Sequence, residues 1–428
     1  MLGKFKNIFA VKELRNKVLF ILFVLVTFRF AANIPLPGVN AKHLQELFAS
    51  NSGQLLGMFN MFSGGGLSNI SIVLLGVGPY ITSSIIMQLL TMIVPRLEQL
   101  YKEEGDAGRQ KFNMISRVLT VPLAIVQTTA MITVLKSQQV IDVTSAIQYG
   151  SIIITAVTGT IFLMWLGELI TEKGLGNGVS IMIFAGIVAS LPSTFMQFKE
   201  VAFNQTQIFT YVMFLVIVIV TILGVVFVTE GKRIIPISYA RRMRGGQQYG
   251  GARTHLPLRI NQAGVIPIIF AVSLVLFPRM IGQILMQMQG HETIAHIGSV
   301  MTNIFANQWV YGIVYFSLVV MFTYFYTAVV FDPQKIAENL QRQGGYVEGM
   351  RPGRETAEYL GKVVNRITLP GSLFLGSIAI LPIVVQAFLP ASQMISVGGT
   401  SLLIVVSVVI EMVKQIDAQL VMRDYESI

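Results

Sequence analysis

The chain has 428 residues, of which 53% are hydrophobic and 12% are charged, whereas a soluble globular domain carries about 25% charged residues. This composition excludes an ordinary soluble protein, and the absence of cysteine excludes disulfides, thiolate metal ligands and cysteine nucleophiles. The formal net charge of +10 is compatible with acidic or phosphate-bearing partners. Repeated apolar runs of about 20 residues instead indicate a polytopic membrane protein.

Ten apolar segments follow one another along the chain. A basic stretch precedes the first one, but no small-residue cleavage site follows it, so we interpret it as a retained span and not as a signal peptide. The sequence therefore predicts an all-α polytopic membrane protein with ten transmembrane helices. The segments cover approximately residues 18–34, 72–94, 114–134, 150–170, 178–195, 207–229, 262–282, 308–331, 367–389 and 397–418.

The stretch from Ser63 to Val94 is the most unusual part of the sequence. It opens with three glycines, and its apolar run is interrupted by Gly76, Gly78 and Pro79. Backbone that is not helical is tolerated at membrane depth only where it is buried in protein or lines a cavity. We therefore expect a broken opening segment and then a helix that faces something other than lipid. The alternative is a loop followed by an ordinary kinked span.

The charges of the connecting loops predict the orientation. The connections on one side hold few basic residues, namely Lys42, Lys136 and Lys199, while most other lysines and arginines lie on the opposite side. Positive charge favours the cytoplasmic side, so both chain termini are predicted to be cytoplasmic.

Two of the basic loops are long, at about residues 230–257 and 331–365. The first predicts a two-stranded hairpin with a basic tip, and the second predicts two short helices around a bend rich in glycine and arginine. Basic residues next to the spans are explained by topology or by anionic lipid. Basic tips far from the membrane favour docking of a large cytoplasmic partner.

Division near residue 200 gives an amino-terminal half, 1–200, and a carboxy-terminal half, 201–428, with five spans in each. An odd number of spans gives the two halves opposite topology, which is the arrangement of an inverted repeat. Sites in such proteins lie near the midplane between the halves. We therefore expect the functional centre among the second, fifth, seventh and tenth spans.

The spans carry little chemistry. Their centres are nearly free of ionisable groups, and no catalytic, phosphate-binding or metal-binding motif is present, which argues against an enzyme and against an ion-coupled transporter. Branched aliphatic residues lie near the glycine-broken positions. Residue type alone cannot distinguish ordinary helix packing from a hydrophobic constriction, because both use branched aliphatic side chains. These branched residues are Val77, Ile81, Val179, Ile183, Ile269 and Ile404.

Five segments resemble the SecY family, the channel subunits of the bacterial Sec protein translocase. The resemblance runs in order along essentially the whole chain. It implies two five-helix halves around an hourglass pore that opens sideways to lipid. The segments are FNMFSGGGLSNISIVLLGVGPYITSSIIMQLL (59–90), GTIFLMWLGELITEKGLGNGVSIMIFAGIVASLP (159–192), THLPLRINQAGVIP (254–267), GMRPGRETAEYL (349–360) and GGTSLLIVV (398–406).

The resemblance also implies roles for individual residues. The family's apolar pore ring falls on the six branched residues named above. The plug, a short displaceable helix that blocks the outer funnel and needs weak packing, falls on about 62–72: Phe62, Ser63, Gly64, Gly65, Gly66, Leu67, Ser68, Asn69 and Ile70. The lateral gate falls on Thr82, Gln88, Asn261 and Phe277. Partner docking falls on Arg241, Arg242, Arg244 and Arg351.

The function implied is a passive protein-conducting channel of the bacterial plasma membrane, without cofactor or metal. The partners implied are SecE, SecG, the SecA motor ATPase, ribosomes, signal-bearing precursor proteins and membrane lipid, with no specific nucleic acid beyond ribosomal RNA. Two alternatives remain. A secondary transporter would need a coupling ion and a saturable site, and an insertase would act on membrane proteins only.

Overall fold

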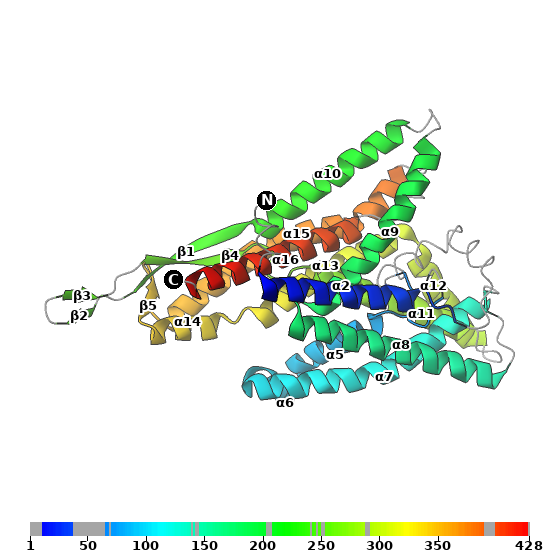
Figure 1. The fold of residues 1–428 in the computed structure, drawn as a ribbon, viewed down its shortest axis with the longest axis horizontal. Helices are drawn as coiled ribbons and strands as arrows, with labels where there is room; N and C mark the ends of the chain where they lie inside the picture. The colour runs from blue at the N-terminus through cyan, green and yellow to red at the C-terminus, as the bar shows by residue number, and fades with distance from the viewer. Residues whose placement is uncertain are drawn as a thin grey trace.

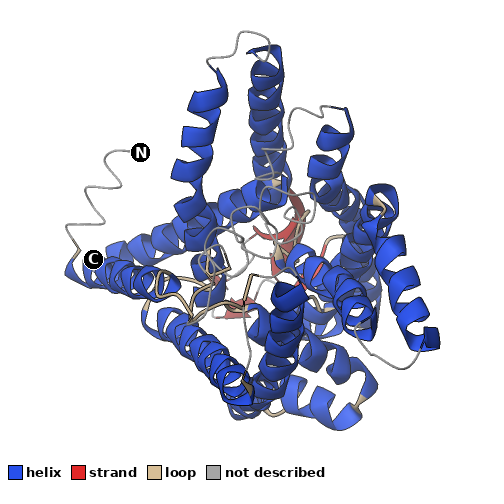
Figure 2. Ribbon diagram, turned by 90° about the vertical axis from the view of Figure 1, so that its right-hand side faces the viewer, coloured by secondary structure: helices blue, strands red, loops and turns tan. Residues whose placement is uncertain are grey.

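In the computed structural model the protein is mostly helical, and many of its helices run along the long axis of the molecule (Figure 1). The strands lie at one end of that axis, and in the end-on view they lie behind the helices (Figure 2). The structure describes residues 11–36, 65–67, 70–137, 140–141, 145–202, 208–239, 242–244, 247–249, 253–286, 292–388 and 399–426.

Each apolar segment predicted in the amino-terminal half overlaps one long helix. The second segment begins in turns and becomes helical only at Gly78. The chain then bends by 113° at Val94, between α5 and α6, because a residue before proline is disfavoured in the helical region. The helices are α2 (Lys12–Ala32), α5 (Gly78–Ile93), α6 (Pro95–Lys102), α7 (Gly105–Ser137), α8 (Ala146–Lys173) and α9 (Gly178–Ala202).

The carboxy-terminal half shows the same agreement and one unexpected element. Helix α12 lies in the connection between the predicted spans 262–282 and 308–331, where no helix was predicted. The helices are α10 (Ile208–Glu230), α11 (Ile266–Met286), α12 (Glu292–Ala306), α13 (Gln308–Val330), α14 (Pro333–Arg342), α15 (Arg354–Phe388) and α16 (Gly399–Glu426).

By length and composition alone, four helical stretches among the described residues qualify to cross a membrane, and a fifth qualifies if the bent pair α5–α6 is one span. The four are α7, α8, α13 together with α14, and α15. The apolar parts of α9, α10 and α11 are shorter. The number of ten membrane crossings therefore remains a prediction.

The predicted hairpin over loop 230–257 is confirmed. Strand β1 (Lys232–Tyr239) pairs antiparallel with β4 (Arg253–Arg259), and β2 (Arg242–Arg244) pairs with β3 (Gln247–Tyr249) at the tip. The tip lies at the extreme end of the molecule (Figure 1).

The prediction for loop 331–365 is wrong in two respects. One short helix, α14, is present, but the residues from Arg354 onward already belong to α15, and β5 (Gly345–Val347) lies between them. Strand β5 pairs with β1, which gives a sheet of order β4-β1-β5. The strand forms because Val347 buries its side chain in one apolar cluster with Ile235 and Leu360. The chain is mostly helical, as predicted, and the two long loops fold together into one small α/β unit.

Candidate pore and seams between the halves

Residues 72–77 form the non-helical opening that the sequence predicted before α5. They lie in consecutive turns, with Gly76 at φ +58°, and Val73, Leu74 and Leu75 are fully buried. Helix α8 approaches them so closely that a Cβ on Gly159 would collide with the carbonyl oxygen of Ile72. This irregular backbone is therefore buried in protein, as the membrane environment requires.

A second break separates α8 from α9 and sets where α9 begins. Gly176 takes φ +90°, and the Asn177 side chain accepts hydrogen bonds from the backbone N–H groups of Val179 (3.0 Å) and Ser180 (3.3 Å). Such capping satisfies two of the unpaired donors at a helix start. A Cβ on Gly178 would collide with the carbonyl oxygen of Gly167, so this position needs glycine.

A third break precedes α11. Gly264 takes φ +65°, and Asn261 Nδ2 donates to the carbonyl oxygen of Gly264 at 3.1 Å. The backbone N–H groups of Ile268 and Ile269 then donate to the carbonyl oxygen of Val265. The three breaks thus determine the starts of α5, α9 and α11, and each start places a branched residue within its first turns.

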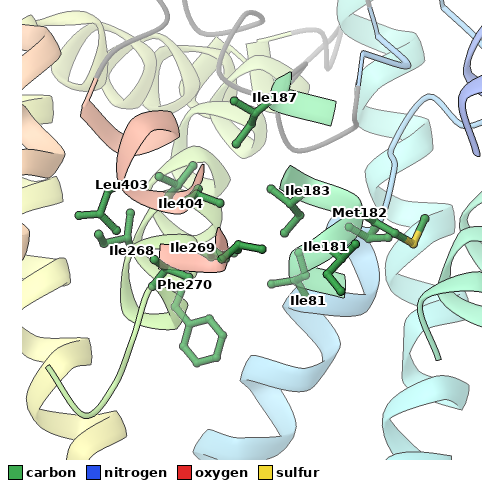
Figure 3. Packing of buried hydrophobic residues seen from close by; sticks show 14 of the residues in the cluster. Ile81, Ile181, Met182, Ile183, Ile187, Ile268, Ile269, Phe270, Leu403 and Ile404 are labelled. Carbon is green, nitrogen blue, oxygen red and sulfur yellow. The ribbon is translucent and has the colours of Figure 1, made fainter. Parts of the chain in front are cut away.

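These branched residues come together between the two halves. Ile81 of α5 and Ile183 of α9 face Ile269 of α11 and Ile404 of α16 (Figure 3). Each of the four is at most 7% exposed, and all belong to one apolar cluster. Val77 is buried in the same cluster, and Val179 packs against it half-buried. All six predicted ring positions therefore line or border a single apolar junction.

The two halves meet along two lines of contact. Helices α5 and α7 contact α11, which we call the gate seam. Helix α9 contacts α16, and Lys17 Nζ of α2 donates to Gln419 Oε1 of α16 at 3.5 Å, which we together call the α16 seam. Gln415 of α16 also lies beside the break before α9, since its Oε1 is 3.1 Å from where a Cβ on Gly176 would be.

Two of the four predicted gate residues are amide side chains with incomplete hydrogen bonding. Asn261 is 6% exposed and, among the described residues, its Oδ1 has no partner. The same holds for Oε1 of the half-buried Gln88. The side chain of Phe277 lies outside the described part of the chain.

Thr82 is the fully paired member of this group. Its hydroxyl donates to the carbonyl oxygen of Gly78 at 3.0 Å and accepts from Gln127 Nε2 of α7 at 3.4 Å. Gln127 is a functional residue that was not among the predicted ones, and its one signal in the sequence is a glutamine inside the apolar segment 114–134. The Thr82 hydroxyl therefore joins α5 to α7 within the amino-terminal half.

Four of the predicted plug residues are described. Leu67 and Ile70 are fully buried in a cluster with Ile132 and Leu135 of α7, so the weak packing that we expected is not found there. Ser71 N donates to the carbonyl oxygen of Gly66 at 2.8 Å, and a Cβ on Gly65 would lie 2.9 Å from Arg29 Nη1. The other predicted plug positions lie outside the described residues: Phe62, Ser63, Gly64, Ser68 and Asn69.

The predicted docking arginines gather at one end of the molecule. Arg242 and Arg244 lie on β2 at the tip of the hairpin, and Arg351 is exposed just after β5. Arg241 lies outside the described residues. Since β5 pairs with β1, the two loops present their basic residues from one folded unit.

The sequence comparisons agree on one family. A family model described as SecY matches residues 71–413. A protein of Streptomyces galbus named protein translocase subunit SecY is 42% identical, with 100% of this chain and 99% of that protein covered. A Mycobacterium leprae protein of the same name is 41% identical with the same coverage.

Solved structures share the fold at lower identity. One described as the structure of a protein conducting channel has a TM-score of 0.64 and 19% identity, and the match covers 93% of this chain and 90% of that chain. Sec61 in the canine ribosome-channel complex has a TM-score of 0.58, 17% identity and the same coverage. On the full-length similarity to named relatives and the match of the family model, the chain belongs to the SecY family.

Proposed function

We propose that the chain is a protein-conducting channel that passes unfolded polypeptides across a bacterial plasma membrane. The observation that carries the proposal is the apolar junction, to which α5, α9, α11 and α16 each contribute an isoleucine from the two halves (Figure 3). Relatives named as protein translocase subunits and a similar fold described as a protein conducting channel support it.

The chemistry of the junction suits a passage without sequence preference. Charged or strongly hydrogen-bonding groups would hold some passing segments more tightly than others. Branched aliphatic side chains contact any chain loosely and exclude water and ions when they close on one another. In our proposal the ring that seals the resting channel consists of Val77, Ile81, Val179, Ile183, Ile269 and Ile404.

The gate seam is in our proposal the exit for hydrophobic segments into lipid. A signal helix gains about 25 cal/mol per Å² of apolar surface that leaves water, so hydrophobicity alone can sort signal helices from secreted segments. The hydrophobicity that a helix needs to enter the gate seam would be set by Thr82, Gln88, Asn261 and Phe277. The segment around 62–72 would act as the plug on the outer side.

The partners in this proposal follow from the charge and from the relatives. The basic unit of β1–β5 would dock a motor ATPase or a ribosome, and a similar fold is described as the yeast Ssh1 complex bound to the 80S ribosome. SecE, SecG, SecA and signal-bearing precursors would complete the translocase. The start of α2 and the end of α16 lie on the side of the molecule that carries the sheet (Figure 1). Because the sheet would dock cytoplasmic partners, both chain termini would lie in the cytoplasm.

The test uses the absence of cysteine from the chain. Single cysteines at Ile81 and Ile269 would be tested for disulfide formation with a cysteine in a secretory precursor stalled during transport. The control is Leu223 on α10, which is 64% exposed on the outer surface of the helix array. We expect crosslinks at the two junction positions and none at Leu223.

A precursor that crosslinks only to the loop carrying Arg242 and Arg244 would contradict the pore and leave a docking role. A membrane protein that crosslinks at Ile269 while a secreted precursor does not would indicate an insertase. Crosslinks of equal yield at Ile81 and Leu223 would mean that the precursor does not pass through the junction.

A further inference from the structure

Helix α12 is the element that neither the sequence analysis nor the proposed channel explains. It packs tightly against α11 and also contacts α13. The crossing with α11 is made by two glycines: a Cβ on Gly298 would lie 2.7 Å from the carbonyl oxygen of Gly282, and a Cβ on Gly282 would lie 2.9 Å from that of Gly298. Gly282 is within about one turn of the end of α11, so α12 crosses α11 near that end.

The face of α12 that points away from α11 is apolar. Ile297 is 54% exposed, Val300 42% and Ile304 48%. Their spacing of three and four residues aligns them in one stripe along the helix. The stripe has a polar border, since the exposed His296 and Asn303 lie beside it on the same helix. An exposed apolar stripe with a polar border is typical of a helix that lies in the plane of a membrane interface.

The surroundings of α12 place it at a membrane–water boundary. It lies at the end of the molecule opposite the basic sheet (Figure 1). Its only residue with a full charge at neutral pH is Glu292, in the first position of the helix. Trp309, 58% exposed, follows in the first turn of α13, and tryptophan is enriched where spans meet the headgroups.

We propose that α12 is an interfacial helix whose stripe, Ile297, Val300 and Ile304, is immersed in the acyl-chain boundary of the outer leaflet. Lipid is the occupant because the stripe is continuous in character with the exposed apolar side chains of the flanking helices, Ile281 on α11 and Ile313 on α13. A protein partner would be expected to meet a mixed surface with hydrogen-bonding groups at its centre, whereas here the exposed polar side chains lie at the edges of the stripe, His296 and Asn303 along one border and Thr293 one turn before Ile297.

The contact with lipid has a consequence for the gate, and this step rests on the proposed function. At Gly282 and Gly298 helices α11 and α12 lie so close that a Cβ on either glycine would collide with the main chain of the other helix, so we expect a displacement of the outer end of α11 to carry α12 with it. Helix α12, held at the interface by its apolar stripe, then resists movement of α11 along the membrane normal and permits movement of α11 within the membrane plane.

The experiment measures depth in the full chain, without any precursor, so its outcome does not depend on channel activity. Single cysteines at Ile304 and, as the matched neighbour on the polar border, at Asn303 would carry the NBD fluorophore. The protein would be reconstituted in vesicles of phosphatidylcholine and phosphatidylglycerol, with Leu223 on α10 as the lipid-contact control. Two quenchers of the NBD fluorescence would be compared. One is a lipid that carries a nitroxide at a shallow depth, and the other is iodide in the aqueous phase on both sides of the membrane.

We expect the lipid-borne quencher to act at least about twofold more strongly at Ile304 than at Asn303, and iodide to show the reverse order. In a second variant, Ile297→Asp should remove the lipid quenching of the Ile304 label, while His296→Asp on the polar border should leave it unchanged. Equal iodide quenching at both positions would overturn the proposal. So would a label at Ile304 that neither quencher reaches, because a protein would then cover the stripe.

Discussion

The gate seam and the α16 seam join the same two halves with different chemistry. Across the α16 seam a polar contact joins Lys17 to Gln419, and Gln415 fills the space beside Gly176. Among the side chains that the structure describes in α5 and α11, no hydrogen bond or ion pair crosses the gate seam. The start of α11 instead holds the unpartnered Oδ1 of Asn261.

The difference bears on which seam can open. An unsatisfied buried polar atom costs about 1–3 kcal/mol relative to its hydrated form, and this cost is relieved when water or a polar group reaches it. If Asn261 borders the gate seam, as we propose, opening that seam would hydrate its amide oxygen, whereas opening the α16 seam would break contacts already made. In the proposed channel we therefore expect α5 and α11 to separate while α9 and α16 stay together.

The largest expected effect comes from a charge in the apolar junction. Ile269→Asp would bury a carboxylate at a position that is 4% exposed, and an unpaired buried charge costs on the order of several kcal/mol. We expect the junction to hydrate and the resting channel to leak ions, measured as flux through reconstituted vesicles. Ile269→Val, which costs about 0.5–1.5 kcal/mol, is the matched control and should stay tight. A tight Ile269→Asp channel would show that this junction is not the seal.

A smaller effect is expected from the polar groups near the gate seam, and its sign depends on their hydrogen bonds. Asn261→Leu removes the amide oxygen that has no partner among the described residues, and it also removes the Nδ2 bond to the carbonyl oxygen of Gly264. Because backbone bonds to Val265 also hold the start of α11, we expect the first effect to dominate and to stabilise the closed state by about 1 kcal/mol, or about fivefold in the closed-to-open ratio. The measurement is the hydrophobicity that graded signal sequences need for export, which should rise.

Thr82→Val should shift the same threshold in the opposite direction. It removes the acceptor of the Gln127 amide and leaves that buried group without a partner, which destabilises the packing of α5 on α7. If both variants move the threshold in the same direction, hydrogen bonding does not determine how the seam opens.

A weaker effect is expected at the α16 seam. The contact from Lys17 to Gln419 is long and partly exposed, so Gln419→Leu should cost less than about 1 kcal/mol. Thermal unfolding and the signal threshold should both remain near those of the parent chain. A threshold shift as large as that of Asn261→Leu would mean that the two seams open together.

The smallest effect concerns the ion pair between Glu230 at the end of α10 and Lys414 of α16, at 2.6 Å. The hydrogen bond from Lys414 holds the pKa of Glu230 below its ordinary value. The pair therefore contributes stability at pH values above the unfolded pKa of about 4.3, and this contribution is lost as the pH falls through the lower folded pKa. Glu230→Gln should make the free energy of unfolding fall slightly less steeply as the pH is lowered, as measured by unfolding at a series of pH values from neutral to acid. If the pH dependence of the free energy of unfolding is the same in this variant as in the parent chain, the ion pair is not formed.

The sequence was informative where glycine, proline and apolar length act locally. The break before α5 was predicted from Gly76 and Gly78, because glycine permits backbone conformations that other residues avoid. The hairpin of β1 and β4 was predicted from alternation and turn residues. These signals need no knowledge of distant contacts.

Elements that depend on distant contacts were missed. Strand β5 exists because Val347 meets β1 more than a hundred residues earlier in the chain, which no local pattern reveals. Helix α12 was hidden because its apolar stripe is shorter than a span. The convergence of Ile81 and Ile269 came from the family resemblance, since isoleucine at such positions is equally typical of ordinary packing.

The most direct test of the account is a distance measurement across both seams in one preparation. Spin-label pairs would be placed on exposed residues, Met92 of α5 with Leu274 of α11, and Val188 of α9 with Val409 of α16. Double electron–electron resonance would compare the resting channel with one that holds a stalled precursor. We predict that the Met92–Leu274 distance lengthens while the Val188–Val409 distance stays constant. Equal lengthening of both distances, or no change in the first, would contradict a channel that opens at the gate seam.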